Sequence, residues 1–277
     1  MPLHRPSELK EFLDTLGIYP KKSLSQNFLL DGNIIKKILA IAELNPGDPI
    51  LEIGPGPGVL TEAMLNAGAI VTAVEKDSLL AKALNRLDPS GQHLDVHCMD
   101  VMDFSIPTHL SPNHLTKVIA NLPYHLTTPI LIELVNHSTY FSHIVVMVQD
   151  EVAKRFTADP GTKLYGSISV FLQFYTQPEY CFKVSRNCFY PKPNVDSAIV
   201  KLTLKRPPDG VDPGLFFNMT RTAFNQRRKM LQTTLQAIYP KEHIHQALIS
   251  LNMPISCRPE ELSLKQFILL FNFLNTL

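Results

Sequence analysis

Cysteine and long apolar runs are both scarce in this chain of 277 residues. Its cysteines, Cys98, Cys181, Cys188 and Cys257, form no Cys-x-x-Cys pair, which argues against a zinc site and against a secreted disulfide framework. The N-terminus shows no apolar stretch of the signal-peptide kind, and the longest apolar run, near Phe267 to Leu274, is far shorter than a bilayer span. We therefore expect no membrane insertion, no metal and a reducing cytoplasmic location.

The chain also lacks a strong net charge, which is only +1, but its charge is unevenly distributed. Residues 1–200 carry 16 Lys and Arg against 20 Asp and Glu, and residues 201–277 carry 10 against 5, so the two parts have net charges of −4 and +5. A basic C-terminal part favours a polyanionic partner engaged at that end. The alternative is that these lysines and arginines are simply a solvated surface.

Strand-like and helical runs alternate along the first part of the chain. The expected strands are 49–53, 70–74, 94–99, 117–120 and 143–148, and the expected helices are 59–66, 78–87, 128–136 and 150–156. This βαβ series predicts an α/β fold of Rossmann type, with a parallel sheet covered by helices. A helical run at 167–175 and two strand-like runs at 180–184 and 197–204 follow, and the two runs are close enough to form an antiparallel pair at a sheet edge.

The sequence Arg206-Pro207-Pro208-Asp209-Gly210 is the strongest break in the chain, because consecutive prolines interrupt both helices and strands. We place a domain boundary there, between residues 1–206 and residues 211–277. Beyond the break the apolar spacing is helical at 215–224, 230–238, 243–251 and 261–274, with no strand signal. The sequence therefore predicts a small all-helical C-terminal domain.

Asn121-Leu122-Pro123-Tyr124 follows the apolar run Val118–Ala120, where a buried strand meets the mouth of an α/β sheet. The Asn121 side-chain oxygen and the Leu122 carbonyl, held by the rigid Pro123, are two acceptors that could hold both hydrogens of a planar amine. Tyr124 would stack on the ring that carries this amine. The alternative is a strand-ending turn in which Asn and Pro serve the backbone.

A glycine-rich turn, Gly54-Pro55-Gly56-Pro57-Gly58, follows the first expected strand of the sheet, but the third glycine of a dinucleotide-binding loop is missing because Val59 occupies its position. Glu75 ends the next strand, where a carboxylate can accept hydrogen bonds from a ribose diol. Asp100 follows the third expected strand, 94–99, and could accept a hydrogen bond from an adenine amine. A ligand with a ribose and an adenine but no phosphates fits this pattern, so S-adenosylmethionine is the expected cofactor and the fold a methyltransferase sheet.

Several motifs occur in this chain together, from near the N-terminus to the helical tail. They are Ser25-Gln26-Asn27-Phe28-Leu29, EIGPGPGVLT at Glu52 to Thr61, the tetrapeptide Asn121–Tyr124, Phe189-Tyr190-Pro191-Lys192-Pro193-Asn194-Val195-Asp196-Ser197 and Ala223-Phe224-Asn225-Gln226-Arg227-Arg228-Lys229. In this order they resemble the ribosomal RNA adenine dimethyltransferases, the KsgA/RsmA family. The resemblance implies a methyltransferase domain and a helical RNA-contacting domain. It also implies a substrate of two adjacent adenosines in a hairpin loop near the 3′ end of small-subunit rRNA, each methylated twice during ribosome biogenesis.

The resemblance assigns site residues position by position. Its cofactor contacts fall on Asn27, Leu29, Gly54, Glu75, Asp100 and Asn121, to which the glycine turn adds Gly56. Phe189 matches the aromatic residue that faces the target base opposite Tyr124, although its own sequence surroundings are typical of a core residue. The chain departs from the family at Ser25, where a Gly is usual, and at His125, where an Asn is usual, so the resemblance does not specify the shape of the target pocket there.

Arg221, Arg227, Arg228 and Lys229 form a basic segment with Phe224 among them, which favours RNA contact over a merely solvated helix end. We expect the partner to be small-subunit rRNA or a partly assembled small subunit, and the protein to be a monomer. Other functions stay open at this point. They are a resistance-type methyltransferase of large-subunit rRNA, a non-catalytic RNA-binding assembly factor and, third, a nicotinamide oxidoreductase.

Overall fold

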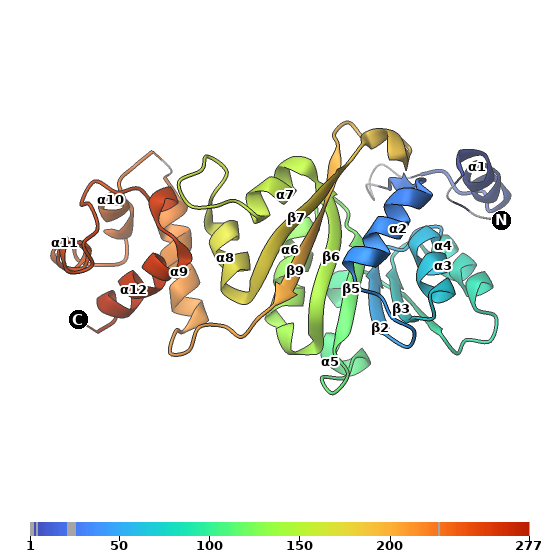
Figure 1. The fold of residues 1–277 in the computed structure, drawn as a ribbon, viewed down its shortest axis with the longest axis horizontal. Coiled ribbons are helices and arrows are strands. Elements are labelled where there is room, and N and C mark those ends of the chain that lie inside the picture. The colour runs from blue at the N-terminus through green and yellow to red at the C-terminus, as the bar shows by residue number, and fades with distance from the viewer. Residues whose placement is uncertain (1–2, 4, 21–25, 227, 277) are drawn as a thin grey trace. The chain divides into compact units, whose positions relative to one another are not determined.

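The computed structural model describes residues 3, 5–20, 26–226 and 228–276, and its central feature is a seven-stranded sheet (Figure 1). The strand order is β4-β3-β2-β5-β6-β9-β7. The strands are β2 (Pro49–Ile53), β3 (Ile70–Glu75), β4 (Leu94–Cys98), β5 (Thr116–Asn121), β6 (Phe141–Gln149), β7 (Thr176–Val184) and β9 (Ser197–Leu204). Strands β4, β3, β2, β5 and β6 pair in parallel and β9 runs antiparallel to β6. The predicted α/β fold of Rossmann type is confirmed.

The helices connect the strands and make up most of the C-terminal part. They are α1 (Pro6–Thr15), α2 (Gly32–Ile41), α3 (Val59–Asn66), α4 (Ser78–Leu84), α5 (Ile106–His109), α6 (Thr127–Asn136), α7 (Asp150–Phe156), α8 (Ser167–Tyr175), α9 (Pro213–Phe224), α10 (Leu231–Leu235), α11 (Lys241–Ser250) and α12 (Leu264–Leu274). Short 3₁₀ turns lie at Val101–Asp103 and Arg186–Cys188. Asp31 and Asp77 cap α2 and α4 by accepting hydrogen bonds from the first-turn backbone N–H groups. Helix α1 was not predicted from the sequence.

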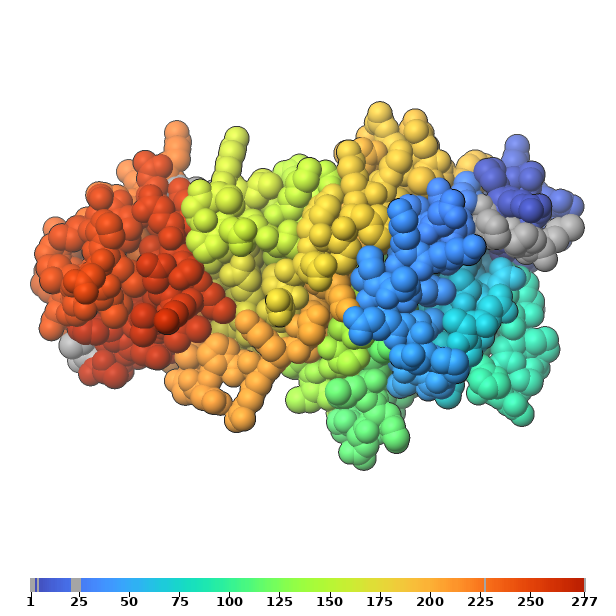
Figure 2. All heavy atoms as spheres, viewed as in Figure 1, coloured from blue at the N-terminus to red at the C-terminus, as the bar shows by residue number. Residues whose placement is uncertain are grey.

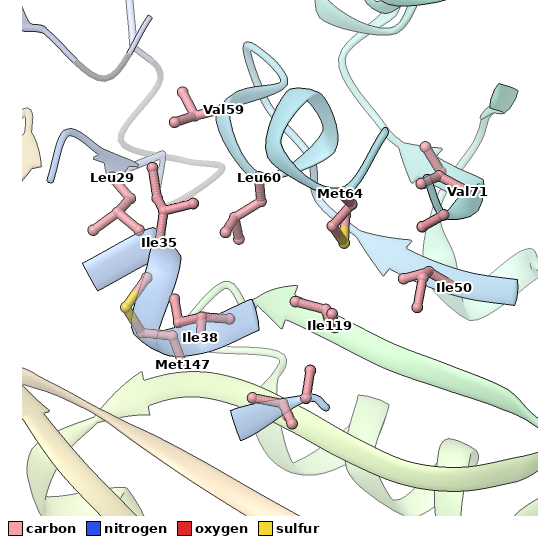
Figure 3. Packing of buried hydrophobic residues seen from close by; sticks show 14 of the residues in the cluster. Leu29, Ile35, Ile38, Ile50, Val59, Leu60, Met64, Val71, Ile119 and Met147 are labelled. Atoms are coloured by element: carbon pink, nitrogen blue, oxygen red, sulfur yellow. The ribbon is translucent and has the colours of Figure 1, made fainter. Parts of the chain in front are cut away.

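One face of the sheet packs against α2 and α3. Alternate strand residues such as Ile50 and Ile119 point to this face, where they meet Ile38 of α2 and Leu60 and Met64 of α3 (Figure 3). All of these side chains are buried. Figure 2 shows the atoms of α2, in blue, covering the strands that lie behind it in Figure 1.

The intervening strand residues point to the opposite face. Leu51 and Ile53 of β2 border a small apolar gap together with Ile130 and Leu134 of α6. Because the parallel strands are covered on both faces, only their ends are available for a ligand.

The chain divides into two compact units, which we call the sheet unit (residues 1–153 and 179–204) and the helical unit (residues 154–178 and 205–277). The predicted boundary at 206–211 is close to the third crossing between them, which follows Leu204. However, the sequence placed residues 154–178 in the first domain, whereas in the structure they group with the helical unit. The reason is aromatic packing, since the Phe174 ring of α8 lies 5.2 Å from that of Phe216 and 5.0 Å from that of Phe217, both in α9.

The described helices include none that combines the length and the apolar character needed to cross a membrane. The same described part of the chain contains no cluster of three or more His, Cys, Asp or Glu side chains suited to hold a metal ion.

Candidate active site at the strand ends

A pocket opens at the carboxyl ends of β4, β3, β2 and β5, and it encloses about 930 Å³ when the part open to solvent is counted. It is lined by residues of five segments of the sheet unit, namely Gln26–Phe28, Ile53 with Gly54 and Gly56, Val74–Lys76, Met99–Val101, and Asn121–Leu126. Most of the residues predicted from the sequence therefore meet here. They are Asn27, Gly54, Gly56, Glu75, Asp100, Asn121, Leu122, Pro123 and Tyr124.

The glycine turn requires glycine for steric reasons. Gly56 has φ +58°, and a Cβ atom on it would lie 2.9 Å from the Phe28 ring. Gly58 has φ +89°, and its Cβ would lie 2.7 Å from Leu84. Both the left-handed backbone and the close neighbours exclude a larger residue.

The backbone N–H groups of this turn are already engaged within the protein. Gly54 donates to the Val74 carbonyl (2.9 Å), Gly56 to Oε2 of Glu75 (2.9 Å) and Gly58 to the Pro55 carbonyl (3.0 Å). A phosphate-binding loop instead directs such N–H groups at its anion. The turn is therefore built to approach a ligand closely and not to hold a pyrophosphate.

Glu75 is buried at the end of β3 and faces this turn. Its Oε1 accepts a hydrogen bond from the Asp77 N–H (2.8 Å), while Oε2 accepts the one from Gly56. Burial raises the pKa of Glu75, and these two backbone N–H groups oppose that rise by stabilising the carboxylate. Each carboxylate oxygen has a second lone pair, so Glu75 can still accept from two hydroxyl groups of a ribose.

Asp100 follows β4 and is held by two donors. Lys76 Nζ lies 2.7 Å from Oδ2, and the Met102 N–H donates to Oδ1 over 3.0 Å. The hydrogen bond from Lys76 is the main reason why the pKa of Asp100 lies below its ordinary value. The sequence analysis did not assign Lys76 to the pocket, although its position directly after Glu75 on the adjacent strand end could have suggested it.

Asn121 ends β5, and its amide nitrogen donates to the Asn27 carbonyl over 2.9 Å. This bond joins the predicted N-terminal motif to the fourth strand end. It also fixes the rotation of the carboxamide, because the nitrogen side is turned to Asn27 and Oδ1 must face away from it as an acceptor. A Cβ atom on Gly54 would lie 3.8 Å from the Asn121 carbonyl oxygen, so the two strand ends are in close contact.

The next residues continue the pocket wall. The Leu122 N–H donates to the Met147 carbonyl (3.2 Å), and the Pro123 carbonyl accepts from the Leu126 N–H (3.0 Å). Tyr124 is half-buried, and its hydroxyl group lies 3.0 Å from Oγ of the buried Ser197. Burial raises the pKa of Tyr124, so its phenol keeps its proton at neutral pH. Sequence reasoning missed Ser197 as the partner of Tyr124.

Two of the remaining predicted positions in the sheet unit, Leu29 and Phe189, lie outside the pocket lining. Leu29 and Phe189 are paired in the short ladder between β1 (Phe28–Leu29) and β8 (Phe189–Tyr190), and both side chains belong to the core, at 4% exposure each. Neither is among the described residues that line the pocket. His125 lines it and is exposed. Ser25 lies outside the described residues.

The predicted basic segment belongs to the helical unit. Arg221 is exposed in the last turn of α9, and Arg228 and Lys229 are exposed in the turn that follows it. Arg227 lies outside the described residues. Phe224, which the sequence analysis placed among these charges, packs inward with its ring 5.8 Å from that of Phe267 and 6.0 Å from that of Tyr165. Its role is therefore in the core of this unit.

The polar groups of the pocket fit one type of ligand best. Glu75, Asp100 and Oδ1 of Asn121 are acceptors, and the cation Lys76 is already paired with Asp100. Acceptors suit hydroxyl and amine groups, and carboxylates repel phosphates. The site therefore fits a nucleoside with a positively charged substituent, as S-adenosylmethionine is, better than it fits a dinucleotide.

Comparison with known proteins agrees with this chemistry. The family model described as ribosomal RNA adenine dimethylase matches residues 19–276. A protein of Protochlamydia amoebophila named ribosomal RNA small subunit methyltransferase A is 53% identical, and the match covers 98% of this chain and 97% of the relative. A protein of the same name from Chlamydia caviae is 45% identical, with 98% of each chain covered.

Two solved structures also resemble the chain over most of its length. A dimethyladenosine transferase from Plasmodium falciparum has a TM-score of 0.78 and 25% identity, and the match covers 90% of this chain and 98% of that one. The 23S rRNA methyltransferase ErmE has a TM-score of 0.71 and 27% identity, with 90% and 99% covered.

Proposed function

The chain belongs to the ribosomal RNA adenine dimethylase family, and on this premise we propose that it dimethylates the exocyclic amines of two adjacent adenosines in the 3′-terminal hairpin loop of small-subunit rRNA. The methyl donor is S-adenosylmethionine. The substrate is the rRNA itself or a partly assembled small subunit in the cytoplasm, and the enzyme acts as a monomer. The relatives at 53% and 45% identity, which are named for the small subunit, support this branch over the large-subunit one.

One observation carries the proposal more than any other. Asn121 donates an amide hydrogen to the Asn27 carbonyl, which leaves Oδ1 as an acceptor at the strand end, and Leu122 lines the same pocket. With the Leu122 carbonyl as the second acceptor, the two hold both hydrogens of an adenine amine and direct its nitrogen lone pair away from them. The same two acceptors still hold the one remaining hydrogen of a singly methylated amine, which the second transfer requires.

The other strand ends form the part of the pocket that takes the cofactor. Glu75 holds the ribose hydroxyl groups, Asp100 accepts from the adenine amine of the donor, and the glycine turn allows close approach. When bound, S-adenosylmethionine supplies a sulfonium methyl group that passes to the amine nitrogen, leaving S-adenosylhomocysteine and one proton released to water. The residues of the chain contribute mainly by holding the reacting groups in line.

The target base must leave its stack to reach this pocket. Tyr124 offers it one aromatic face, and its hydroxyl bond to Ser197 limits how far the ring can tilt. Phe189 is the proposed second aromatic, and because it is buried in the β1–β8 ladder it has to become accessible when RNA binds. The exposed Arg221, Arg228 and Lys229 bind RNA phosphates, and Arg227 adds a further charge in the sequence.

The experiment that tests the proposal measures the product directly. The protein is incubated with S-adenosylmethionine and undermethylated small subunits, and the digested rRNA is analysed for N6,N6-dimethyladenosine by mass spectrometry. Asn121→Ala is the inactive variant, and Asn113→Ala, at an exposed turn, is the matched control. Dimethyladenosine from wild type and control alone is the expected result.

Other outcomes would contradict it. Methylation only of large-subunit rRNA, supplied in parallel, would assign the enzyme to the resistance type that the likeness to the 23S rRNA methyltransferase also allows. RNA binding without any methyladenosine would identify a non-catalytic assembly factor.

A further inference from the structure

A buried hydrogen bond lies behind the glycine turn. Thr61 Oγ1 donates to Oε2 of Glu52 over 2.6 Å. Glu52 is 1% exposed and Thr61 is 0% exposed, and neither is among the described residues that line the pocket. Glu52 stands in β2 just before Gly54, and Thr61 stands in the first turn of α3 just after Gly58. The bond therefore joins the two ends of the glycine turn.

A carboxyl group in this position is costly unless it is neutral. Burial raises the pKa of Glu52 to about 8; the hydrogen bond from Thr61 opposes this rise, and the nearby Glu75 carboxylate adds to it. Glu52 therefore carries a proton at neutral pH and acts as a neutral hydrogen-bonding group. An apolar side chain of similar volume would avoid the desolvation cost, so the polar pair has to contribute orientation beyond packing.

The turn that this bond closes neighbours two residues of the cofactor site. The Gly56 N–H donates to Oε2 of Glu75 over 2.9 Å, and a Cβ atom on Gly54 would lie 3.8 Å from the Asn121 carbonyl oxygen. A shift of α3 relative to β2 would move the turn away from both residues. Because interactions of oriented groups depend on geometry, a small displacement here weakens cofactor binding even when the fold is intact.

We propose that Glu52 and Thr61 are positioning residues, whose buried hydrogen bond sets the glycine turn against Glu75 and Asn121 and so determines the affinity for the methyl donor. The proposal deepens the proposed function and rests on it, because it assumes that this pocket takes S-adenosylmethionine. It assigns no role in RNA binding to either residue.

Thr61→Val tests it, because valine has the shape of threonine without the hydroxyl group. We expect the Kd and the KM for S-adenosylmethionine to rise about tenfold, with kcat at saturating donor and the Kd for rRNA unchanged. Thr61→Ser keeps the hydroxyl group, so its KM for S-adenosylmethionine should equal that of the wild type. Isothermal titration with S-adenosylmethionine and steady-state methylation give these values.

A second variant separates orientation from stability. Glu52→Met together with Thr61→Val replaces both polar partners by apolar groups, a change that is nearly neutral for folding. We expect a thermal midpoint close to that of the wild type and still a several-fold weaker affinity for S-adenosylmethionine. Wild-type affinity in this double variant, or a Thr61→Val effect on kcat and on RNA binding equal to the effect on the donor KM, would overturn the proposal. Failure of the wild type itself to bind S-adenosylmethionine would instead overturn the proposed function.

Discussion

The sheet unit and the helical unit hold their proposed binding groups in opposite ways. The sheet unit carries 14 Lys and Arg against 19 Asp and Glu, a net charge of −5, and the helical unit carries 12 against 6, a net charge of +6. Glu75 and Asn121 are each bonded to backbone groups in the sheet unit. Arg221, Arg228 and Lys229 are exposed in the helical unit.

The two units should therefore respond to different solution conditions. Buried carboxyl groups have shifted pKa values and are poorly screened by ions, so the sheet unit should be sensitive to pH. Exposed cations that contact phosphates release counterions, so the helical unit should be sensitive to salt.

The largest expected effect concerns stability and Glu52. Its pKa is raised to about 8 in the folded protein from an ordinary value of 4.5, so the folded state keeps a proton that the unfolded state releases. The free energy of unfolding should therefore fall as the pH rises from about 4.5 to about 8, by on the order of a few kcal/mol, and then level off. Glu52→Gln, which stays neutral, should be more stable than the wild type at pH 8.

Urea unfolding of both proteins at several pH values measures this difference. The advantage of Glu52→Gln should shrink toward zero near pH 4.5. An advantage that is the same at every pH would mean that folding does not shift the pKa of Glu52, and the assignment of pH sensitivity to the sheet unit would lose its main support.

The second effect is on catalysis. Asn121→Ala removes the fixed acceptor and the bond to the Asn27 carbonyl, and we expect kcat to fall about a hundredfold or more because the amine loses its orientation. The Kd for rRNA, measured by filter binding, should stay at the wild-type value. A parallel loss of RNA affinity would show that catalysis and RNA binding are not separated between the sheet unit and the helical unit as proposed.

The meeting of several predicted residues in one pocket has a physical reason. Gly54, Glu75, Asp100 and Asn121 each lie at the end of a strand in a βαβ series or just after it, and parallel strands bring their carboxyl ends to one edge. Local spacing alone therefore predicts their proximity. The bounds predicted for α3 and α8 are also those of the structure, since apolar spacing and turn residues set them locally.

The features that could not be predicted from the sequence depend on contacts between distant segments. The bond between Tyr124 and Ser197 and the pairing of Phe189 with Leu29 require the fold to be known. The grouping of residues 154–178 with the helical unit has the same cause, because aromatic side chains of α8 and α9, which are far apart in the sequence, pack together. No local pattern encodes such pairings.

The third effect is on RNA binding. Replacing Arg221, Arg228 and Lys229 by Ala should weaken rRNA binding roughly tenfold or more at moderate salt and lower the slope of log K against log salt by about one per lost phosphate contact. The Kd for S-adenosylmethionine should not change. Lys265→Ala, an exposed lysine on α12, is the matched control and should leave both values unchanged. An unaltered salt slope in the triple variant would remove this segment from the RNA contact.

The smallest effect tests the hydrogen bond that holds Tyr124, whose ring we expect to stack on the target base. Ser197→Ala removes the partner of the Tyr124 hydroxyl group and Tyr124→Phe removes the hydroxyl group itself, so each should lower kcat/KM for rRNA by about two- to tenfold. Because both changes delete the same bond, the double variant should be no worse than the poorer single one. Additive losses in this cycle would mean that Ser197 does not act through Tyr124. Salt should not alter the size of the loss, since a neutral hydrogen bond in a half-buried site is not screened, and this separates the Tyr124 contact from the phosphate contacts of the helical unit.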